Sequence, residues 1–575
     1  MRIQIAIAML LLTALTGCFG PFTRFQSAEE SERDKDLEVP LVGDMASSVP
    51  IGMEQISGVG LVTGLDGTGH SPQGPARILL EKQLLKQKIE RVKDALDSPN
   101  NALVMVSALV PPGHRKGEPL DVEVTLPPNS RTTSLRGGYL HDCPLREYKA
   151  RNNETVAGNI LAHAQGSLLV GLGAPNSEIE LRRGQAWEGG VFLGERPFYL
   201  RMKKGDKSYR VTQAVANRLN NLFREDPHKR QPLHDRLQSL DGVSEQLNQK
   251  FDPAAVNRGE VARAINAETL AISVPYAYRL NPERYVRIAQ LVPLQETPEQ
   301  RPKYRQRLLK MLLDPQETLK AAWRLEALGQ DSIASLKKGL QSGDPLVRFA
   351  AAESLTYLGN VAGVEELARL AERHQPLRHW SLLALANLDE SVSRAKLAEL
   401  LDRPDPELRS GAFVAFRLLD RADPRSRDER LGAELLNEGY WLHQVAPQST
   451  PLVYMSLSKR AEIVLFGRNV ALTPPVKILA GPEFTITAER LDKRCTVSRI
   501  GAKGGVRHAS SSLQVDDVLR TMAELGAQYP DVVEFLRKAD ERKCLNCPLR
   551  INNLPEPVPL ETLAESGRDP QFLRD

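Results

Sequence analysis

A repeat with a period of about 30 residues restricts the fold of this 575-residue chain more than any other feature. Residue pairs ending in proline recur at spacings of 30, 31 and 30 residues, namely Asp314-Pro315, Asp344-Pro345, Gln375-Pro376 and Asp405-Pro406. Each pair places a turn and an N-cap before an apolar helix, because proline suits the first turn of a helix. Apolar side chains recur eight and eleven positions after each start and predict equivalent core positions: Ala322, Ala352, Leu383 and Phe413, then Leu325, Leu355, Ala386 and Phe416.

A second helical pattern fills the back of each unit, over Ser332–Leu340, Val364–Ala371 and Ser393–Leu401. The range 305–425 therefore predicts helical hairpins, which resemble HEAT repeats and stack into an α-solenoid. A helical bundle without stacking is the alternative, because only about three and a half units are visible in the sequence.

Size and composition indicate several folded domains. A chain of 575 residues exceeds the usual size of a single hydrophobic core. With 41% hydrophobic and 26% charged residues, it is neither a polytopic membrane protein nor a wholly disordered chain. Its 76 basic and 72 acidic residues are interspersed and give a net charge of +4, so nucleic acid is not an expected partner.

The first residues of the chain carry an export signal. Arg2 precedes an apolar stretch, Ile3–Leu15, that suits a signal peptide and is too short to span a bilayer. Leu15-Thr16-Gly17-Cys18 resembles the lipobox of bacterial lipoproteins, in which small residues precede a cysteine that is acylated and becomes the mature N-terminus. We therefore predict a lipoprotein signal peptide over 1–17. A lipidated flexible tether over 18–44 follows, which anchors the protein at Cys18 without spanning the membrane.

The region 45–295 combines strand and helix patterns and predicts an α+β fold. Short apolar runs alternate with glycine over Ile56–Gly69, and a helix is expected over Pro75–Leu96. Strands are expected over Ala102–Val110 and Leu120–Leu126. The glycine spacing, GxGxxxG, differs from that of nucleotide-binding motifs, so tight turns are favoured over phosphate binding.

Three motifs follow one another in this region. The first, Gly58–Gly69, contains Gly58, Gly60, Gly64, Gly67 and Gly69 and is similar to the GLVxGLxGTG pattern of the bacterial flagellar P-ring protein family. The second, Ser134–Leu140, resembles an SLRGG stretch and contains Ser134, Arg136, Gly137 and Gly138. The third, Ala164–Gly171, is similar to an AQG-x-L-x-VGG stretch and contains Gln165 and Gly166. Three motifs in this order are hard to obtain by chance.

The resemblance extends further and is interrupted by the repeats. A helix around Val211–Asn221 and a strand around Ala264–Pro275 resemble the segments that follow in that family, and Ser512–Ala527 with Pro530–Leu536 is similar to its helical C-terminus. We expect a P-ring-like C-terminal α+β region over 440–555, with a β-hairpin at Val476–Thr487, and a tail over 556–575. The inserted repeats, the lipid anchor and Leu172, where the family tends to have glycine, depart from the family pattern.

The resemblance implies a structural subunit of the flagellar basal-body P ring, a periplasmic bushing around the rod that is needed for motility. It implies self-assembly into a ring and contact with the rod and other basal-body ring proteins, with peptidoglycan as a further candidate partner. Together with the lipid anchor, it implies a periplasmic location, at the outer membrane rather than the inner. The alternative is a non-flagellar envelope lipoprotein scaffold that recruits a protein partner through its helical repeats.

The sequence does not indicate an enzyme, a cofactor or a metal site. It contains no HExxH, GxSxG or Walker A motif, and its ten histidines are scattered. Cys143, Cys495, Cys544 and Cys547 form an even set in an exported chain and predict a structural disulfide, with three connectivities open. A redox role for Cys544 and Cys547 is a weaker alternative, because this CxxC lacks the strand-to-helix context of a thioredoxin site.

Overall fold

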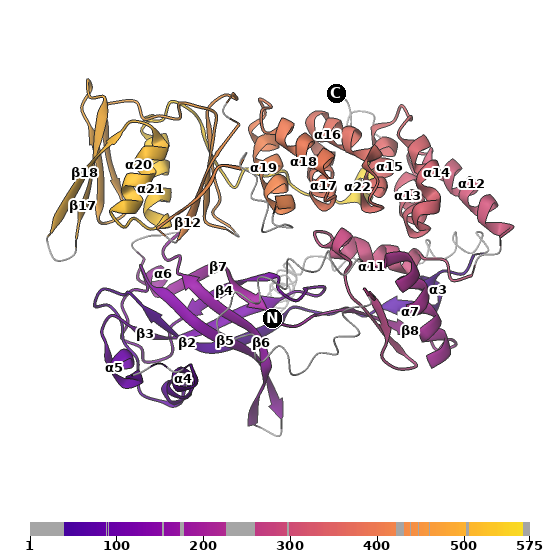
Figure 1. Cartoon of the computed structure of the whole chain (residues 1–575), viewed down its shortest axis with the longest axis horizontal. Helices are drawn as coiled ribbons and strands as arrows, with labels where there is room; N and C mark the ends of the chain where they lie inside the picture. The colour runs from indigo at the N-terminus through magenta and orange to yellow at the C-terminus, as the bar shows by residue number, and fades with distance from the viewer. Residues whose placement is uncertain are drawn as a thin grey trace, which may run out of the picture.

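The computed structural model describes residues 39–566 except 88, 90, 152–153, 173–176, 226–258, 296–297, 421–430, 438, 447, 459 and 502–504. The predicted signal peptide and the lipidation site at Cys18 lie outside the described residues. The predicted flexible tether over 18–44 is wrong for its last residues, because Val39, Leu41 and Val42 are buried. Figure 1 shows a barrel and a small sheet module below, with a C-terminal domain and a helical array above them. None of the helices in the described ranges combines the length and the apolar character that crossing a membrane requires.

Six antiparallel strands close a barrel in the order β2-β3-β4-β7-β6-β5. Burial alternates along β4, where Val122 and Val124 face the barrel core and Asp121 and Glu123 face solvent. The expected strand over Ala102–Val110 is confirmed as β3, and β4 begins and ends one residue before the expected strand. The strands are β2 (Glu54–Thr63), β3 (Ala102–Val110), β4 (Pro119–Thr125), β5 (Tyr139–Arg151), β6 (Glu154–Ser167) and β7 (Arg183–Phe192).

The prediction of one helix over Pro75–Leu96 is wrong, because the structure has α4 (Pro75–Lys86) and α5 (Val92–Asp97). Arg91 lies between them in the left-handed region, with a φ of 55°, and this conformation ends helical continuity. Both helices pack against the outer face of β2 and β3 in a small separate core. Ile78 and Leu85, which match the helical pattern of the sequence, are exposed instead of packed.

A four-stranded antiparallel sheet in the order β1-β8-β10-β9 forms the small sheet module. Helix α7 (Tyr209–Phe223) matches the expected helix, and β10 lies within the expected strand. The apolar core of this module is continuous with that of the helical array. Its other elements are α3 (Val42–Met45), β1 (Ala46–Ser48), β8 (Phe198–Met202), β9 (Ala262–Ala264), β10 (Thr269–Ile272), the 3-10 turn η3 (Tyr276–Tyr278) and α11 (Pro282–Leu291).

The helical array confirms the predicted hairpins, in which successive helices pack on one another (Figure 1). Asp344 caps α15, since its Oδ1 atom accepts hydrogen bonds from the amides of Leu346 (2.8 Å) and Val347 (3.2 Å). Asp405 caps α19 in the same way. The helices are α12 (Gln300–Leu312), α13 (Thr318–Ala327), α14 (Ile333–Gly339), α15 (Pro345–Tyr357), α16 (Val364–Arg373), α17 (Gln375–Asn387), α18 (Ser391–Leu400) and α19 (Pro406–Asp420).

The first predicted repeat start is wrong in detail. Helix α13 begins at Thr318, three residues after Pro315, because Asp314 accepts a hydrogen bond from the amide of Gln316 (3.0 Å) in a turn. The Asp-Pro pair at Asp314 therefore makes a turn, whereas those at Asp344 and Asp405 cap a helix.

Two sheets with α20 (Val515–Glu524) and α21 (Tyr529–Glu541) between them form the C-terminal domain (Figure 1). The first is mixed, in the order β11-β12-β14-β13-β19, and the second is antiparallel, in the order β15-β16-β17-β18. The expected hairpin is confirmed as β15 and β16, with Gly481 at a φ of 63° in the turn. The strands are β11 (Ala433–Leu436), β12 (Tyr440–Val445), β13 (Leu452–Met455), β14 (Glu462–Phe466), β15 (Val476–Ala480), β16 (Phe484–Ala488), β17 (Arg494–Ile500), β18 (Val506–Ser512) and β19 (Leu549–Ile551).

Candidate functional site

The first and second family-like motifs meet at one end of the barrel. Gly64 and Gly137 face each other there with positive φ values of 82° and 74°, and a Cβ atom on Gly64 would lie 3.3 Å from the carbonyl oxygen of Gly137. The Thr68 hydroxyl donates to the carbonyl oxygens of Leu65 (2.7 Å) and Ser134 (2.8 Å). The two motifs are therefore joined mainly through main-chain atoms.

Other glycines of the first motif are explained by close approach. A Cβ atom on Gly58 would lie 2.5 Å from the carbonyl oxygen of Pro144, and one on Gly60 would lie 2.9 Å from Leu140 Cδ1. A Cβ atom on Gly69 would lie 2.3 Å from the carbonyl oxygen of Asn101. Gly67 has open space around it and a φ of 89°, so its requirement is conformational.

The third motif joins the same end of the barrel. The Leu168 amide donates to the carbonyl oxygen of Gly138 over 2.9 Å, and Gly166 pairs with Leu140 between β6 and β5. The side chain of Gln165 is exposed to solvent. The structure thus brings the three motifs together, although Gln165 takes no part in the packing of the barrel core.

Arg136 of the second motif forms an ion pair with Asp531 of α21. The Asp531 side chain is 3% exposed and that of Arg136 is 19% exposed. Asp531 also accepts a hydrogen bond from the Gln528 amide over 3.0 Å. Burial raises the pKa of Asp531, while Arg136 acts to lower it. Both residues lie in family-like stretches, but 395 positions separate them, so the sequence alone did not indicate that they pair.

Apolar side chains of the barrel also pack against the C-terminal domain. Leu169, from the third motif, is buried in the C-terminal core, and Leu172 and Trp187 pack against that core. We call these contacts and the Arg136–Asp531 pair the barrel joint. Leu172, which departs from the family pattern, therefore contributes an apolar contact to this joint.

A second set of contacts, the array joint, connects the small sheet module to the helical array. Arg284 of α11 donates to Glu353 and to Glu326, over 2.6 Å in each case, and its guanidinium lies 4.4 Å from the centre of the Tyr357 ring. Before α11, Arg279 donates to the carbonyl oxygens at the C-terminal end of α17, Ala386 (2.7 Å) and Asn387 (3.0 Å). The arginines thus reach helices α13, α15 and α17.

The charges of the array joint are fully buried. The side chains of Arg284, Glu326 and Glu353 are 4%, 0% and 1% exposed. The Oε1 atom of Glu353 has no hydrogen-bond partner among the described residues. Burial raises the pKa of Glu353 to about 7, although Arg284 acts to lower it. Two carboxylates therefore share one guanidinium away from water, where an unpaired charge is costly.

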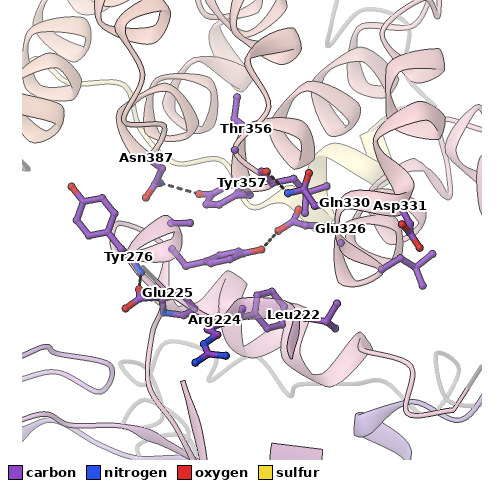
Figure 2. A pocket seen from close by; sticks show the side chains of 18 of the residues that line it. Leu222, Arg224, Glu225, Tyr276, Glu326, Gln330, Asp331, Thr356, Tyr357 and Asn387 are labelled. Carbon is purple, nitrogen blue, oxygen red and sulfur yellow. Dashed lines mark hydrogen bonds between the residues drawn. The ribbon is translucent and has the colours of Figure 1, made fainter. Parts of the chain in front are cut away.

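A cavity of about 650 Å³ lies beside the array joint, between α7, η3 and the ends of α13, α15 and α17. Figure 2 shows Tyr276, Glu326 and Tyr357 around it, with Asn387 donating to the Tyr357 hydroxyl over 3.2 Å. Charged residues in its lining are engaged within the protein, since Arg301 lies 3.8 Å from Asp331 and Glu326 pairs with Arg284. We therefore assign no ligand to this cavity.

The predicted disulfide is wrong, because the structure holds Cys143, Cys495, Cys544 and Cys547 as free thiols. Cys143 lies in the barrel core and Cys495 in the C-terminal core, so the fold keeps them apart. The Cys544 thiol points toward the carbonyl oxygen of Pro475, at 3.7 Å. Burial raises the pKa of Cys143 and raises that of Cys547 to about 11, which disfavours the reactive thiolate. In the described ranges, no cluster of histidine, cysteine or acidic side chains is placed to hold a metal ion.

Comparisons with known proteins match the two parts of the chain separately. Residues 42–303 match the family model of the flagellar P-ring protein, and residues 333–417 match that of HEAT repeats. The flagellar P-ring protein of Chromohalobacter salexigens is 38% identical over 133 residues, which are 23% of this chain and 33% of that protein.

Two further flagellar P-ring proteins align over longer stretches. That of Escherichia coli O6:H1 is 30% identical over 201 residues, or 32% of this chain and 52% of that protein. That of Thermotoga maritima is 27% identical over 284 residues, or 48% of this chain and 69% of that protein. The chain thus spans a third to about half of the length of the first curated relatives. It therefore combines a region similar to flagellar P-ring proteins with a HEAT-repeat array.

Proposed function

We propose that this chain is a structural, non-catalytic subunit of the flagellar basal-body P ring, a periplasmic bushing around the rod. The observation that carries the proposal is the convergence of the three P-ring-like motifs at one end of the barrel, where Arg136 pairs with Asp531 of the P-ring-like C-terminal segment. Motif residues separated by long stretches of sequence thus serve one structural unit. The similarity of residues 42–303 to the flagellar P-ring protein supports the same function.

A ring requires that each copy presents two different, complementary faces to its neighbours. Under this proposal, copies of the chain assemble head to tail and contact the rod and other basal-body ring proteins, with peptidoglycan as a further partner. Under the same proposal, the P-ring-like domains are residues 45–295 and 440–555, and the repeats separate them. Acylation of Cys18 would hold each copy at the outer membrane.

The helical array favours a second candidate function, that of a non-flagellar envelope scaffold. The array joint buries Arg284 with two carboxylates and so connects the array to the P-ring-like region. A rigid array can present a constant surface to a protein partner. In this alternative, the P-ring-like region serves as a base for the array outside any flagellum.

Mass spectrometry of purified hook–basal bodies from the source cell tests the proposal. We expect this chain at a stoichiometry typical of a ring, relative to the rod and hook proteins. Intact rings made of another protein, without this chain, would favour the scaffold function.

A Cys18→Ser variant tests the lipid anchor separately. The substitution should move the protein from the membrane fraction to the soluble periplasm. A variant that stays in the membrane fraction would contradict acylation as the anchor.

A further inference from the structure

The C-terminal segment returns from the C-terminal domain to the helical array. After β19, residues 552–559 cross α19 and α17, and the following helix α22 (Leu560–Ser566) packs against α13. We call residues 552–566 the strap. Figure 1 shows α22 among the helices of the array, away from the C-terminal domain where the strap begins.

The strap is rich in proline and turns part of its surface toward the array. Pro555 is buried, and Leu554 and Val558 pack against the array core, whereas Glu556, Pro557 and Pro559 are exposed. The spacing of Pro555 and Val558 matches the three residues per turn of a polyproline II helix. The inward positions, Leu554, Pro555 and Val558, are those at which side-chain shape matters for binding.

Helices α17 and α19 provide a groove that fits this segment. The indole Nε1 of Trp380 donates to the carbonyl oxygen of Val558 over 2.7 Å. The Nδ1 atom of His379 lies 3.1 Å from the carbonyl oxygen of Pro555, a hydrogen bond that requires the proton on Nδ1. A Cβ atom on Gly411 would lie 2.8 Å from Cγ and Cδ of Pro555 and 2.8 Å from Leu382 Cδ1, so the missing side chain makes room for the proline ring and for α17.

The short helix at the end of the strap adds an apolar anchor. Leu560 is 7% exposed and Leu563 is 0% exposed, and both belong to the core of the array. The groove therefore combines an aromatic donor, room for a proline ring and an apolar anchor site. Aromatic-lined grooves recognise proline-rich segments by these features, because such segments are already extended and lose little entropy on binding.

We propose that the groove over α13, α17 and α19 is a binding site for a proline-rich protein segment that ends in a short apolar helix. The strap is its resident ligand, and a partner segment of the same chemistry binds by displacing it. Since the strap also links the C-terminal domain to the array, its release frees one connection between them. The proposal goes beyond the ring function and holds for a flagellar or a non-flagellar role.

A full-length chain with a site-specific protease sequence inserted after Asn553 tests the proposal. Cleavage leaves the strap in place but removes its covalent link to the C-terminal domain. The probe is a dye-labelled synthetic peptide of residues 554–566. We expect saturable uptake of the peptide by the cleaved chain, measured by fluorescence anisotropy, and at least tenfold weaker uptake by the uncleaved chain, in which the tethered strap competes. No uptake by the cleaved chain, or equal uptake by both forms, would overturn the proposal.

Peptide variants identify the contacts, with an exposed proline as the matched control. A Pro555→Ala peptide should bind several-fold more weakly, whereas a Pro557→Ala peptide should bind like the original. Gly411→Ala in the protein should also weaken binding, and circular dichroism would check that this variant folds, because the added Cβ atom would also lie 2.8 Å from Leu382 Cδ1. Equal binding of the two peptide variants, together with normal binding to the Gly411→Ala protein, would show that the groove does not recognise the proline ring.

Discussion

The barrel joint and the array joint each depend on an arginine that reaches carboxylates on another element, but they differ in burial. Arg136 of the barrel joint is 19% exposed and pairs with Asp531. Arg284 of the array joint is 4% exposed and serves two carboxylates that are essentially inaccessible. Removal of Arg284 leaves two buried carboxylates without their cation, whereas removal of Arg136 leaves one, which also accepts a hydrogen bond from the Gln528 amide. The array joint should therefore be the more sensitive to mutation and to pH.

Removal of Arg284 should cause the largest loss of stability. Arg284→Met leaves Glu326 and Glu353 buried without their cation, which costs about 3–5 kcal/mol for a broken buried pair. Denaturant unfolding followed by circular dichroism would measure the loss. The triple variant Arg284→Met, Glu326→Gln and Glu353→Gln is the control, because it removes all three charges and should recover much of the stability. A triple variant no more stable than Arg284→Met would contradict the electrostatic explanation.

Removal of Arg136 should have a smaller and more local effect. Arg136→Ala leaves the buried Asp531 without its partner at a cost of about 1–3 kcal/mol, and it should loosen the contact of the barrel with the C-terminal domain. Hydrogen exchange in α21 and in Ser134–Leu140 would report this loosening. Lys207→Ala, which breaks the exposed pair of Lys207 and Glu268, is the matched control and should cost less than about 1 kcal/mol. Similar exchange in both variants would mean that Arg136 does not hold the joint.

The array joint should weaken as the pH rises toward neutrality. Burial raises the pKa of Glu353 from 4.5 to about 7, so the folded state binds a proton that the unfolded state has lost. The contribution of Glu353 to stability is fully present below pH 4.5 and is lost as the pH rises through about 7, by an amount on the order of 1–3 kcal/mol.

Melting temperatures between pH 5 and 8 would measure this dependence, with Glu353→Gln as the comparison. The stability of Glu353→Gln relative to the native protein should increase from pH 5 to pH 8. Two buried histidines also make stability depend on pH, so the comparison must use the difference between the two proteins. Burial lowers the pKa of His114 to about 4 and that of His443 to about 3. Their contribution to stability therefore increases as the pH rises toward 6.5, in both proteins alike. A difference that stays constant over this range would contradict the shifted pKa of Glu353.

The smallest expected effect concerns the cysteines. With all four described cysteines as free thiols, a thiol titration of the unfolded, unreduced protein should count each of them. In the folded protein, iodoacetamide should modify the half-buried Cys547 before the fully buried Cys143. If two cysteines of the unfolded protein react only after reduction, they form a disulfide, as predicted from the sequence.

Local patterns in the sequence determined much of this protein. The 30-residue repeat predicted the helical hairpins, an apolar run predicted β3 and alternating apolar residues predicted β4, because these signals come from residues close together in the chain. The glycine motifs predicted the tight turns at Gly64 and Gly67, since a positive φ is a local requirement. The turns expected at Gly58 and Gly60 are wrong, because both residues lie within β2, where close approach of neighbouring strands requires glycine. The resemblance to P-ring proteins rested on the same short motifs.

Contacts between distant residues were decided only by the tertiary structure. The Arg136–Asp531 pair, the sharing of Arg284 by two carboxylates and the seating of Pro555 against Gly411 join segments whose proximity no periodicity encodes. Packing also divided the expected helix over Pro75–Leu96 at Arg91 and placed Cys143 in a different core from the other described cysteines. In each case, the free energy comes from burial and from pairing between segments that are distant in the sequence. A local pattern along the chain does not record which distant segments will meet.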